Sequence, residues 1–303
     1  MHDDSFSTDV TRSSRSSKRR FDDDETFAKR GRRQQLEVIE DTPDEGARWS
    51  TWDQSSPTER GPRPYPDWLV TELAAVDSEL GILKTGKEAD VFLVERGVPD
   101  TDRRCLLAAK RYRASEHRMF HRDSGYLEGR RVRETRTNRA MANRTDFGKQ
   151  AIAGLWAMAE FTALCRLWEA GVPVPYPVQI IDTEVLLEFI GSGDGTEAAP
   201  RLAQLRRDTA DLTDLWHQLV EALSTMARAG LAHGDLSAYN LLVQDGRLVV
   251  IDLPQIVDVV ANPRGKEFLA RDAHNVATWF SQHGVDADGD RLASQLIADA
   301  RLR

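Results

Sequence analysis

The sequence has few of the features that define secreted and membrane proteins. Only two of its 303 residues are cysteines, Cys105 and Cys165, and they form no CxxC pair, so a disulfide framework is excluded. No run reaches the roughly 18 apolar residues that a membrane-spanning helix requires. Residues 1–5 are polar and acidic and lack the apolar region of a secretory signal. These absences predict a cytoplasmic protein with buried, reduced thiols and no membrane contact.

The residues that are present indicate a globular protein with an uneven distribution of charge. Apolar residues make up 40% and charged residues 30%, enough for a sizeable core. The net charge of −8 argues against a general nucleic-acid binder. However, residues 111–150 contain 11 basic and 5 acidic residues, and ten of the basic ones are arginines. Because arginine binds phosphate in a bidentate manner, this segment is either a solvated charged surface or a surface for a phosphate-bearing partner.

Residues 1–66 differ in composition from the rest of the chain. Serine, aspartate and arginine dominate them, and apolar residues are sparse, so burial cannot offset the entropy cost of ordering this segment. The proline-rich stretch at 62–66 is typical of a semi-rigid linker. We therefore expect a disordered, low-complexity tail over residues 1–66 and one folded domain over residues 67–303.

The folded domain is expected to begin mainly with strands and to end mainly with helices, which places it in the α+β class. A short amphipathic helix is expected just after residue 67. The glycine-rich connector at 191–195 suggests a boundary between an N-lobe, 67–191, and a C-lobe, 192–303. The other expected strands lie at 80–84, 91–95, 106–110, 180–181, 185–190, 241–243 and 248–251, and the expected helices at 149–170, 211–229, 265–282 and 290–302.

Three polar side chains are expected to converge at the base of a hairpin in the second half of the chain. Asp235 and Asn240 bracket one loop, and Asp252 follows the hairpin 12 residues after Asn240. The Asp245-Gly246 turn returns the chain to where it began, so Asp252 can lie beside the other two. Carboxylate and amide oxygens suit Mg²⁺ with retained waters. Taken singly, each of the three is better explained as a turn residue or a helix cap.

The order of polar residues along the whole chain matches the parts that phosphoryl transfer requires. Those parts are a turn over the phosphates, a lysine that binds them, a glutamate that holds the lysine, Mg²⁺ ligands and a base. The residues that supply them, in chain order, are Gly86, Lys110, Glu160, Asp235, Asn240 and Asp252. Five roles in the required order favour an ATP-dependent phosphotransferase over a set of unrelated turn residues.

Several motifs resemble those of the RIO family of atypical protein kinases, with the greatest similarity to its type-1 branch. They are the phosphate loop TGKEADVF at 85–92, the helix signature WAMAEF at 156–161, the linker VPVPYP at 172–177, the hinge LEFIG at 187–191, the catalytic loop HGDLSAYN at 233–240, the metal segment IDLPQ at 251–255 and the closing helix EFLARDAHNV at 267–276. The resemblance spans residues 67–282 without a large gap. It implies a two-lobed protein-kinase-like fold, in which a small N-lobe has an antiparallel sheet and one long helix, and a short C-lobe is mainly helical.

The same resemblance implies ATP and Mg²⁺ as cofactors, with Mn²⁺ as a substitute metal. In this interpretation Lys110 binds the α- and β-phosphates and is held by Glu160. The other residues that would border the nucleotide are Lys87 and Glu88 at the phosphates and, through backbone groups at the adenine, Glu188 and Ile190.

The catalytic roles fall on the second half of the chain. By resemblance, Asp235 accepts the proton of the substrate hydroxyl or orients the nucleophile. Asn240 and Asp252 hold Mg²⁺, and Asp252 can itself accept a phosphoryl group. A serine/threonine protein kinase with a protein substrate, capable of autophosphorylation, is therefore the leading hypothesis.

Two alternative functions are also consistent with the sequence. The first is an ATPase-type switch that acts on ribosomal particles through an aspartyl-phosphate, with residues 111–150 as the surface that contacts the particle or its RNA. The second is a small-molecule phosphotransferase, since such enzymes share the His-Gly-Asp loop with an asparagine five residues on. Only about 50 residues follow Asp252, fewer than those enzymes use for a substrate pocket.

Overall fold

The chain divides into two units, residues 1–41 and residues 42–303, and only the second is described below. The computed structural model describes residues 43, 46–113, 146–192, 195, 197–205 and 210–302. Most of the basic segment 111–150 and nearly all of residues 1–45 therefore lie outside the described residues.

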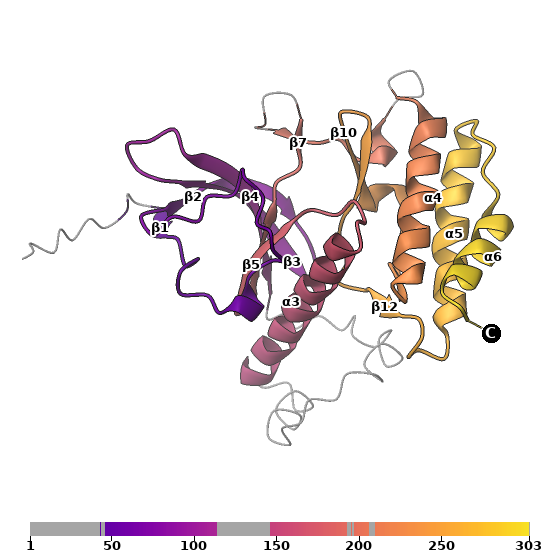
Figure 1. The fold of residues 1–303 in the computed structure, drawn as a ribbon, viewed down its shortest axis with the longest axis horizontal. Helices are drawn as coiled ribbons and strands as arrows, with labels where there is room; N and C mark the ends of the chain where they lie inside the picture. Colours follow the sequence, from indigo (N-terminus) through magenta and orange to yellow (C-terminus); the bar gives the residue numbers. More distant parts are fainter. Residues whose placement is uncertain are drawn as a thin grey trace, which may run out of the picture. The chain divides into compact units, whose positions relative to one another are not determined.

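The first half of the second unit is a six-stranded antiparallel sheet with the order β1-β2-β3-β4-β6-β5 (Figure 1). Its strands are β1 Ala47–Trp49, β2 Val76–Thr85, β3 Ala89–Gly97, β4 Arg104–Tyr112, β5 Pro177–Ile181 and β6 Glu184–Glu188. Each of the three strands predicted before residue 111 is confirmed and is longer than predicted, because the ladder continues from the apolar residues into charged ones. Lys110 lies opposite Val91 on β3 and Val185 on β6, which places it inside the sheet.

One long helix, α3 Asp146–Glu169, packs against this sheet. Its small residues Ala153 and Ala157, together with Phe161, are buried against Ile180 of β5 and Val185 of β6. The helix ends where Gly171 adopts a positive φ of 79°, a conformation that glycine accepts without a Cβ clash. The predicted helix over 149–170 is therefore confirmed.

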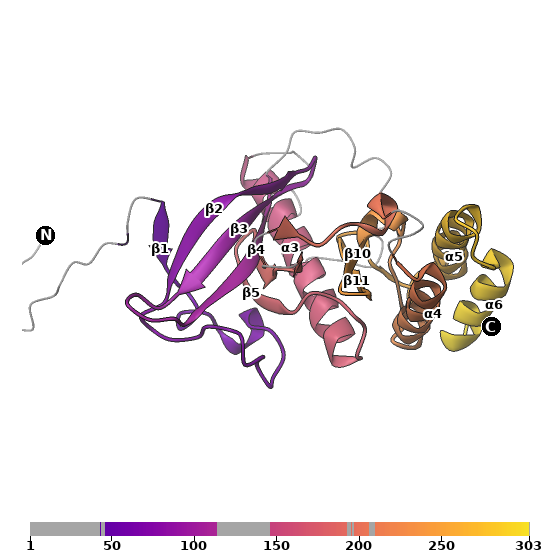
Figure 2. The same cartoon turned by 90° about the horizontal axis from the view of Figure 1, so that it is seen from above.

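Three helices form most of the second half of the unit, and Figure 2 shows them side by side. They are α4 Leu212–Arg228, α5 Gly265–Gln282 and α6 Gly289–Asp299. Their apolar faces meet in one core that includes Leu219, Phe280 and Leu296. The strands before residue 190, followed by these helices, confirm the α+β class.

The short elements of the second half include the hairpin that was expected to carry the candidate metal ligands. Asp245 and Gly246 both have positive φ, 49° and 77°, as a two-residue hairpin turn requires. The short strands are β7 Gly191–Ser192 with β8 Glu197–Ala198, β9 Leu231–Ala232 with β12 Val257–Asp258, and β10 Leu241–Gln244 with β11 Arg247–Val250; the 3₁₀ helices are η1 Pro57–Glu59, η3 Leu202–Gln204 and η4 Ala238–Asn240.

The predicted tail boundary at residue 66 is wrong for residues 46–66. Strand β1 pairs with the first residues of β2, and Trp52 is only 5% exposed in a core that contains Val178. The N–H of Gly61 donates to the Val178 carbonyl at 2.9 Å, and the hydroxyl of Tyr176 donates to the Pro62 carbonyl at 2.8 Å. Averaging the composition over 66 residues concealed these few anchoring side chains.

The short helix expected after residue 67 is also wrong. Residues 67–75 form turns, and β2 begins at Val76. Leu69 and Val70 are buried in the same core as Trp52, so their apolar character reflects tertiary packing rather than a helical stripe. The division of residues 67–303 into lobes at residue 191 stays a prediction.

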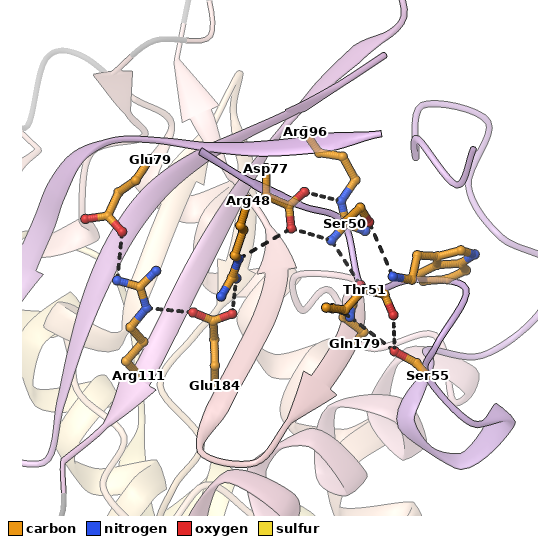
Figure 3. A network of polar contacts seen from close by, with 11 residues as sticks. Arg48, Ser50, Thr51, Ser55, Asp77, Glu79, Arg96, Arg111, Gln179 and Glu184 are labelled. Carbon is orange, nitrogen blue, oxygen red and sulfur yellow. Dashed lines mark hydrogen bonds and ion pairs between the residues drawn. The ribbon is translucent and has the colours of Figure 1, made fainter. Parts of the chain in front are cut away.

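A buried polar network joins the segment before β2 to three strands of the sheet (Figure 3). Arg96 on β3 is fully buried and donates to both carboxylate oxygens of Asp77, at 2.6 and 2.9 Å. It also donates to Gln179 on β5 at 3.0 Å. The amide of Gln179 in turn donates to Thr51 and Ser55, at 3.0 and 3.2 Å. Residues 51–55 are thus integrated into the sheet and its core.

Replacing Trp52 by alanine tests this correction of the domain boundary. Because Trp52 is buried, we expect Trp52→Ala to lower the free energy of unfolding by about 3–5 kcal/mol. Trp49 provides a matched control, since it is 44% exposed and Trp49→Ala should cost no more than about 1 kcal/mol. Urea denaturation of both variants makes the comparison. Equal, small effects would contradict the assignment of residues 46–66 to the folded domain.

Candidate active site

Lys110 is the centre of a buried charged cluster. Its Nζ lies 2.7 Å from Oε1 of Glu160 on α3 and 2.9 Å from Oδ1 of Asp252. Glu160 is 1% exposed, and its oxygens also accept hydrogen bonds from the Tyr112 hydroxyl and, at 3.1 Å, from the Leu253 N–H. The structure thus brings together three of the predicted site residues, from strand β4, helix α3 and the segment after β11.

The charges of this cluster stabilise one another. Burial alone would lower the pKa of Lys110, but Glu160 and Asp252 raise it above its ordinary value. Burial alone would raise the pKa of Asp252, but Lys110, with a smaller contribution from Lys84, lowers it to about 2. Burial and the charge of Glu160 raise the pKa of Tyr112 well above its usual range. At neutral pH, therefore, the lysine is an ammonium ion, Asp252 is a carboxylate and the tyrosine is a neutral donor.

Asp252 lies at the base of the hairpin, as the sequence predicted. The N–H of Ile251 donates to the Asn240 carbonyl at 3.0 Å, so the two ends of the hairpin meet. Asp252 itself has a φ of +67°, in the left-handed region that non-glycine residues rarely occupy.

The catalytic-loop residues are held by contacts within the loop and from α5. The side-chain amide of Asn240 donates to the Asp235 carbonyl at 2.8 Å. Asp272 on α5 accepts the N–H groups of Gly234 at 2.8 Å and Leu236 at 3.1 Å, one on each side of Asp235. The backbone of the loop is therefore fixed, while Asp235 itself is exposed.

Gly234 is required for this arrangement. It has a φ of +85°, and a Cβ at this position would lie 2.2 Å from the Gln255 carbonyl oxygen. The close approach brings the catalytic loop against the segment that follows Asp252, which keeps the two predicted functional segments together.

Asp272 was not predicted as a functional residue, although the sequence carries a signal for it. It falls on the apolar face of α5, which also buries Leu269, Ala273, Val276 and Phe280. A carboxylate on such a face needs donors, and the loop N–H groups supply them. Burial raises the pKa of Asp272, against the opposing effects of His233 and these N–H groups.

We expect Asp272→Asn to lower both stability and catalytic rate. An amide keeps the size of the carboxylate but has one acceptor oxygen, so one of the two buried N–H groups loses its partner, at about 1–3 kcal/mol of unfolding free energy. The control is Asp286→Asn, at an exposed position near α6, which should change neither quantity. Urea denaturation and kcat measurements would reveal the difference; identical values for the two variants would contradict the role of Asp272.

The hinge residues Glu188 and Ile190 use part of their polar groups within the fold. The Glu188 N–H donates to the Tyr176 carbonyl at 2.8 Å, and the Glu188 carboxylate accepts from the Tyr176 N–H at 3.0 Å. The carbonyl of Ile190 accepts from the N–H of Ala199 at 2.9 Å. A contact with adenine would therefore have to use the carbonyl of Glu188 and the N–H of Ile190.

The structure places Lys87 and Glu88 in the exposed turn between β2 and β3. The turn is closed by a hydrogen bond from the Gly86 N–H to the Ala89 carbonyl at 3.0 Å. A Cβ at Gly86 would lie 2.7 Å from that oxygen, so the turn requires glycine. Contact between these residues and phosphates stays a prediction.

The donor set fits a Mg²⁺ ion that is bound together with a nucleotide. Among the described residues, no group of three or more His, Cys, Asp or Glu side chains is placed to hold a metal ion. Asn240 and Asp252 offer one amide and one carboxylate, and Mg²⁺ commonly takes one or two protein carboxylates together with phosphate oxygens and waters. The two residues would hold the ion only as part of a nucleotide complex.

Comparison with known proteins identifies the family. Residues 98–292 match the family model described as the RIO domain. The chain belongs to the RIO family. It is 38% identical over 225 residues to the RIO-type serine/threonine-protein kinase Rio1 of Haloferax volcanii, covering 74% of this chain and 70% of that protein. It is 32% identical over 228 residues to the serine/threonine-protein kinase RIO1 of Chaetomium thermophilum, covering 73% of this chain but only 42% of that protein.

The fold of this RIO-family chain is similar to that of a solved RIO kinase. The match is to the crystal structure of the Rio2 kinase-ADP/Mg²⁺-phosphoaspartate complex from Chaetomium thermophilum, with a TM-score of 0.51 and 20% identity, covering 74% of this chain and 66% of that chain. The two-lobed protein-kinase-like fold predicted from the sequence is confirmed.

The family establishes the class of enzyme. The chain is an atypical serine/threonine kinase of RIO type and hence a phosphotransferase, as the leading hypothesis stated, and a protein substrate follows from that class. The ATPase-switch and small-molecule alternatives are not favoured. None of the helices in the described part of the chain has the length and hydrophobicity needed to span a bilayer.

Proposed function

We propose that this RIO-family chain transfers the γ-phosphoryl group of Mg-ATP to serine or threonine hydroxyls of a protein, its own chain included. The observation that supports this most strongly is the burial of the Lys110 ammonium between Glu160 and Asp252. Such a lysine, held by a helix glutamate beside a metal-binding aspartate, is the arrangement that positions phosphates in protein kinases.

Four of the predicted residues then have defined tasks. Lys110 holds the α- and β-phosphates, and Asn240 and Asp252 hold the metal. Asp235 is exposed, and its backbone is held by Asn240. It accepts the proton of the incoming hydroxyl. Bound Mg²⁺ would neutralise the negative charge on the transferred phosphoryl group. Mn²⁺ is proposed as a substitute because it accepts the same oxygen donors.

A labelling experiment tests this function. The protein is incubated with [γ-³²P]ATP and Mg²⁺, and the labelled product is treated separately with acid and with hydroxylamine. The proposal expects an acid-stable, hydroxylamine-resistant label on serine or threonine that disappears when Mg²⁺ is chelated. A label that hydroxylamine removes, accompanied only by release of phosphate, would instead support an aspartyl-phosphate ATPase cycle.

We propose in addition that the basic segment 111–150 contacts a phosphate-bearing partner such as RNA in a ribosomal particle. Its two described arginines do not support this by themselves, since Arg111 pairs with Glu79 and Glu184, and Arg113 pairs with Asp90. The proposal depends on the remaining nine basic residues of the segment. Binding to ribosomal particles that weakens steeply with salt is the expected result; salt-independent binding or none would contradict it.

A cytoplasmic location is also a proposal. Both cysteines are free thiols, and Cys105 is buried. Burial raises the pKa of Cys165 to about 12, so this thiol is protonated and unreactive at neutral pH. Thiols of this kind are typical of proteins in reducing compartments.

A further inference from the structure

Asp252 is contacted by a second lysine that the roles above do not use. Nζ of Lys84, near the end of β2, lies 3.6 Å from Oδ2 of Asp252, while Lys110 contacts Oδ1 at 2.9 Å. Each oxygen of one carboxylate thus faces its own ammonium group. The Lys84 side chain is 45% exposed, so it can move without disrupting the core.

A β-bulge directs Lys84 toward the site. Strand β2 pairs Ile82 with Phe92 but then pairs Lys84, rather than Leu83, with Val91. Val91 in turn lies opposite Lys110. Residues directly opposite each other in an antiparallel sheet project from the same face, so the bulge places Lys84 on the face that carries Lys110. A regular ladder would have placed Leu83 there instead.

Lys84 also adjoins the turn that is expected to cover the phosphates. The strand is followed at once by the turn that the Gly86 N–H closes. Strand β1 pairs with β2 only over Val76 to Ser78, and from Glu79 to Thr85 the residues of β2 are exposed. A side chain at this end of β2 can therefore readily exchange partners.

We propose that Lys84 is a further phosphate-binding lysine: it pairs with Asp252 in the nucleotide-free protein and binds the γ-phosphate when ATP is present. This inference rests on the proposed function. When Asp252 serves as a Mg²⁺ ligand, Lys110 keeps Glu160 beside it and is assigned to the α- and β-phosphates, whereas Lys84 needs another anion. The exchange is favourable because the Lys84–Asp252 pair is long, at 3.6 Å, and partly exposed, so it contributes little, whereas a charge-assisted bond to phosphate is strong.

Comparing two nucleotides tests this role without measuring catalysis. Calorimetry gives the affinities of Mg-ADP and of the non-hydrolysable Mg-AMP-PNP for the parent protein, Lys84→Met, Lys84→Arg and a control, Lys266→Met, at an exposed position on α5. We expect Lys84→Met to bind Mg-AMP-PNP about tenfold more weakly and Mg-ADP as well as the parent or more tightly. Lys84→Arg should retain most of the affinity, and the control should match the parent.

The other outcomes separate this role from the proposed function. An equal loss of affinity for both nucleotides, or no loss for either, would overturn the γ-phosphate role while leaving the kinase function in place. Failure of the parent protein to bind either nucleotide would overturn the proposed function itself, and the role of Lys84 with it. Thermal unfolding of Lys84→Met, expected to match the parent, establishes that the variant is folded.

Discussion

Lys110→Met is expected to lower the rate of phosphoryl transfer severely and to destabilise the protein at the same time. The variant lacks the cation that we propose positions the phosphates, and the loss of one such group lowers kcat by about 100- to 1,000-fold. It also leaves the buried Glu160 with no cation beside it, since Lys110 is its ion-pair partner. Removing one partner of a buried ion pair costs about 3–5 kcal/mol.

The double variant Lys110→Met/Glu160→Gln separates the two effects. In this variant the neutral amide at position 160 can still accept a hydrogen bond from the Leu253 N–H and can donate one to the Tyr112 hydroxyl. We therefore expect the free energy of unfolding to return to within about 1–2 kcal/mol of the parent value. Asp252 remains partly exposed and keeps Lys84 nearby. The kcat of the double variant should stay as low as that of Lys110→Met. Urea denaturation and kcat measurements on both variants test these expectations. A double variant as unstable as the single one, or an active Lys110→Met, would contradict the roles given to this cluster.

Asp235→Asn, unlike Lys110→Met, should cause a large loss of activity without a loss of stability. The amide cannot accept the proton of the substrate hydroxyl, so kcat should fall by about 10²–10⁴-fold. The residue is exposed, and the bond that Asn240 makes is to its backbone carbonyl, so the free energy of unfolding and the KM for ATP should not change.

The control for this variant is Asp245→Asn, in the β10–β11 turn. Asp245 is exposed and has a φ of 49°, a conformation that asparagine adopts readily. Both stability and activity should match the parent. If Asp235→Asn were as active as this control, Asp235 would not be the base, and the assignment of the catalytic loop would be wrong.

The parts of the fold that could be predicted from sequence are those with a local cause. Helix α5 occupies the predicted range Gly265–Gln282, because its apolar spacing is a property of the segment itself. The hairpin around Asp245 and Gly246 follows from the turn residues. Strand β1 was missed because its partner lies in β2, about 30 residues later, and because Gln179, which binds residues 51–55, lies more than 120 residues away.

The candidate site was predictable in its residues but not in its contacts. The order of Lys110, Glu160 and Asp252 along the chain indicated the chemistry, yet their ion pairs depend on the packing of β4, α3 and the hairpin. Lys84 and Asp272 were not predicted. One reaches the site through a bulge that has no signature in a single sequence, and the other acts through backbone N–H groups whose position only the folded loop determines.

The central claim is that this chain transfers phosphate from Mg-ATP to a hydroxyl with Asp235 as the base. Mass spectrometry of the purified chain after incubation with Mg-ATP tests it most directly, with the parent protein and Asp235→Ala compared at equal concentration and time. The account predicts phosphoserine or phosphothreonine on the parent, at least 100-fold less on the variant, and none on either when Mg²⁺ is chelated. Equal phosphorylation of the parent and the variant would contradict it.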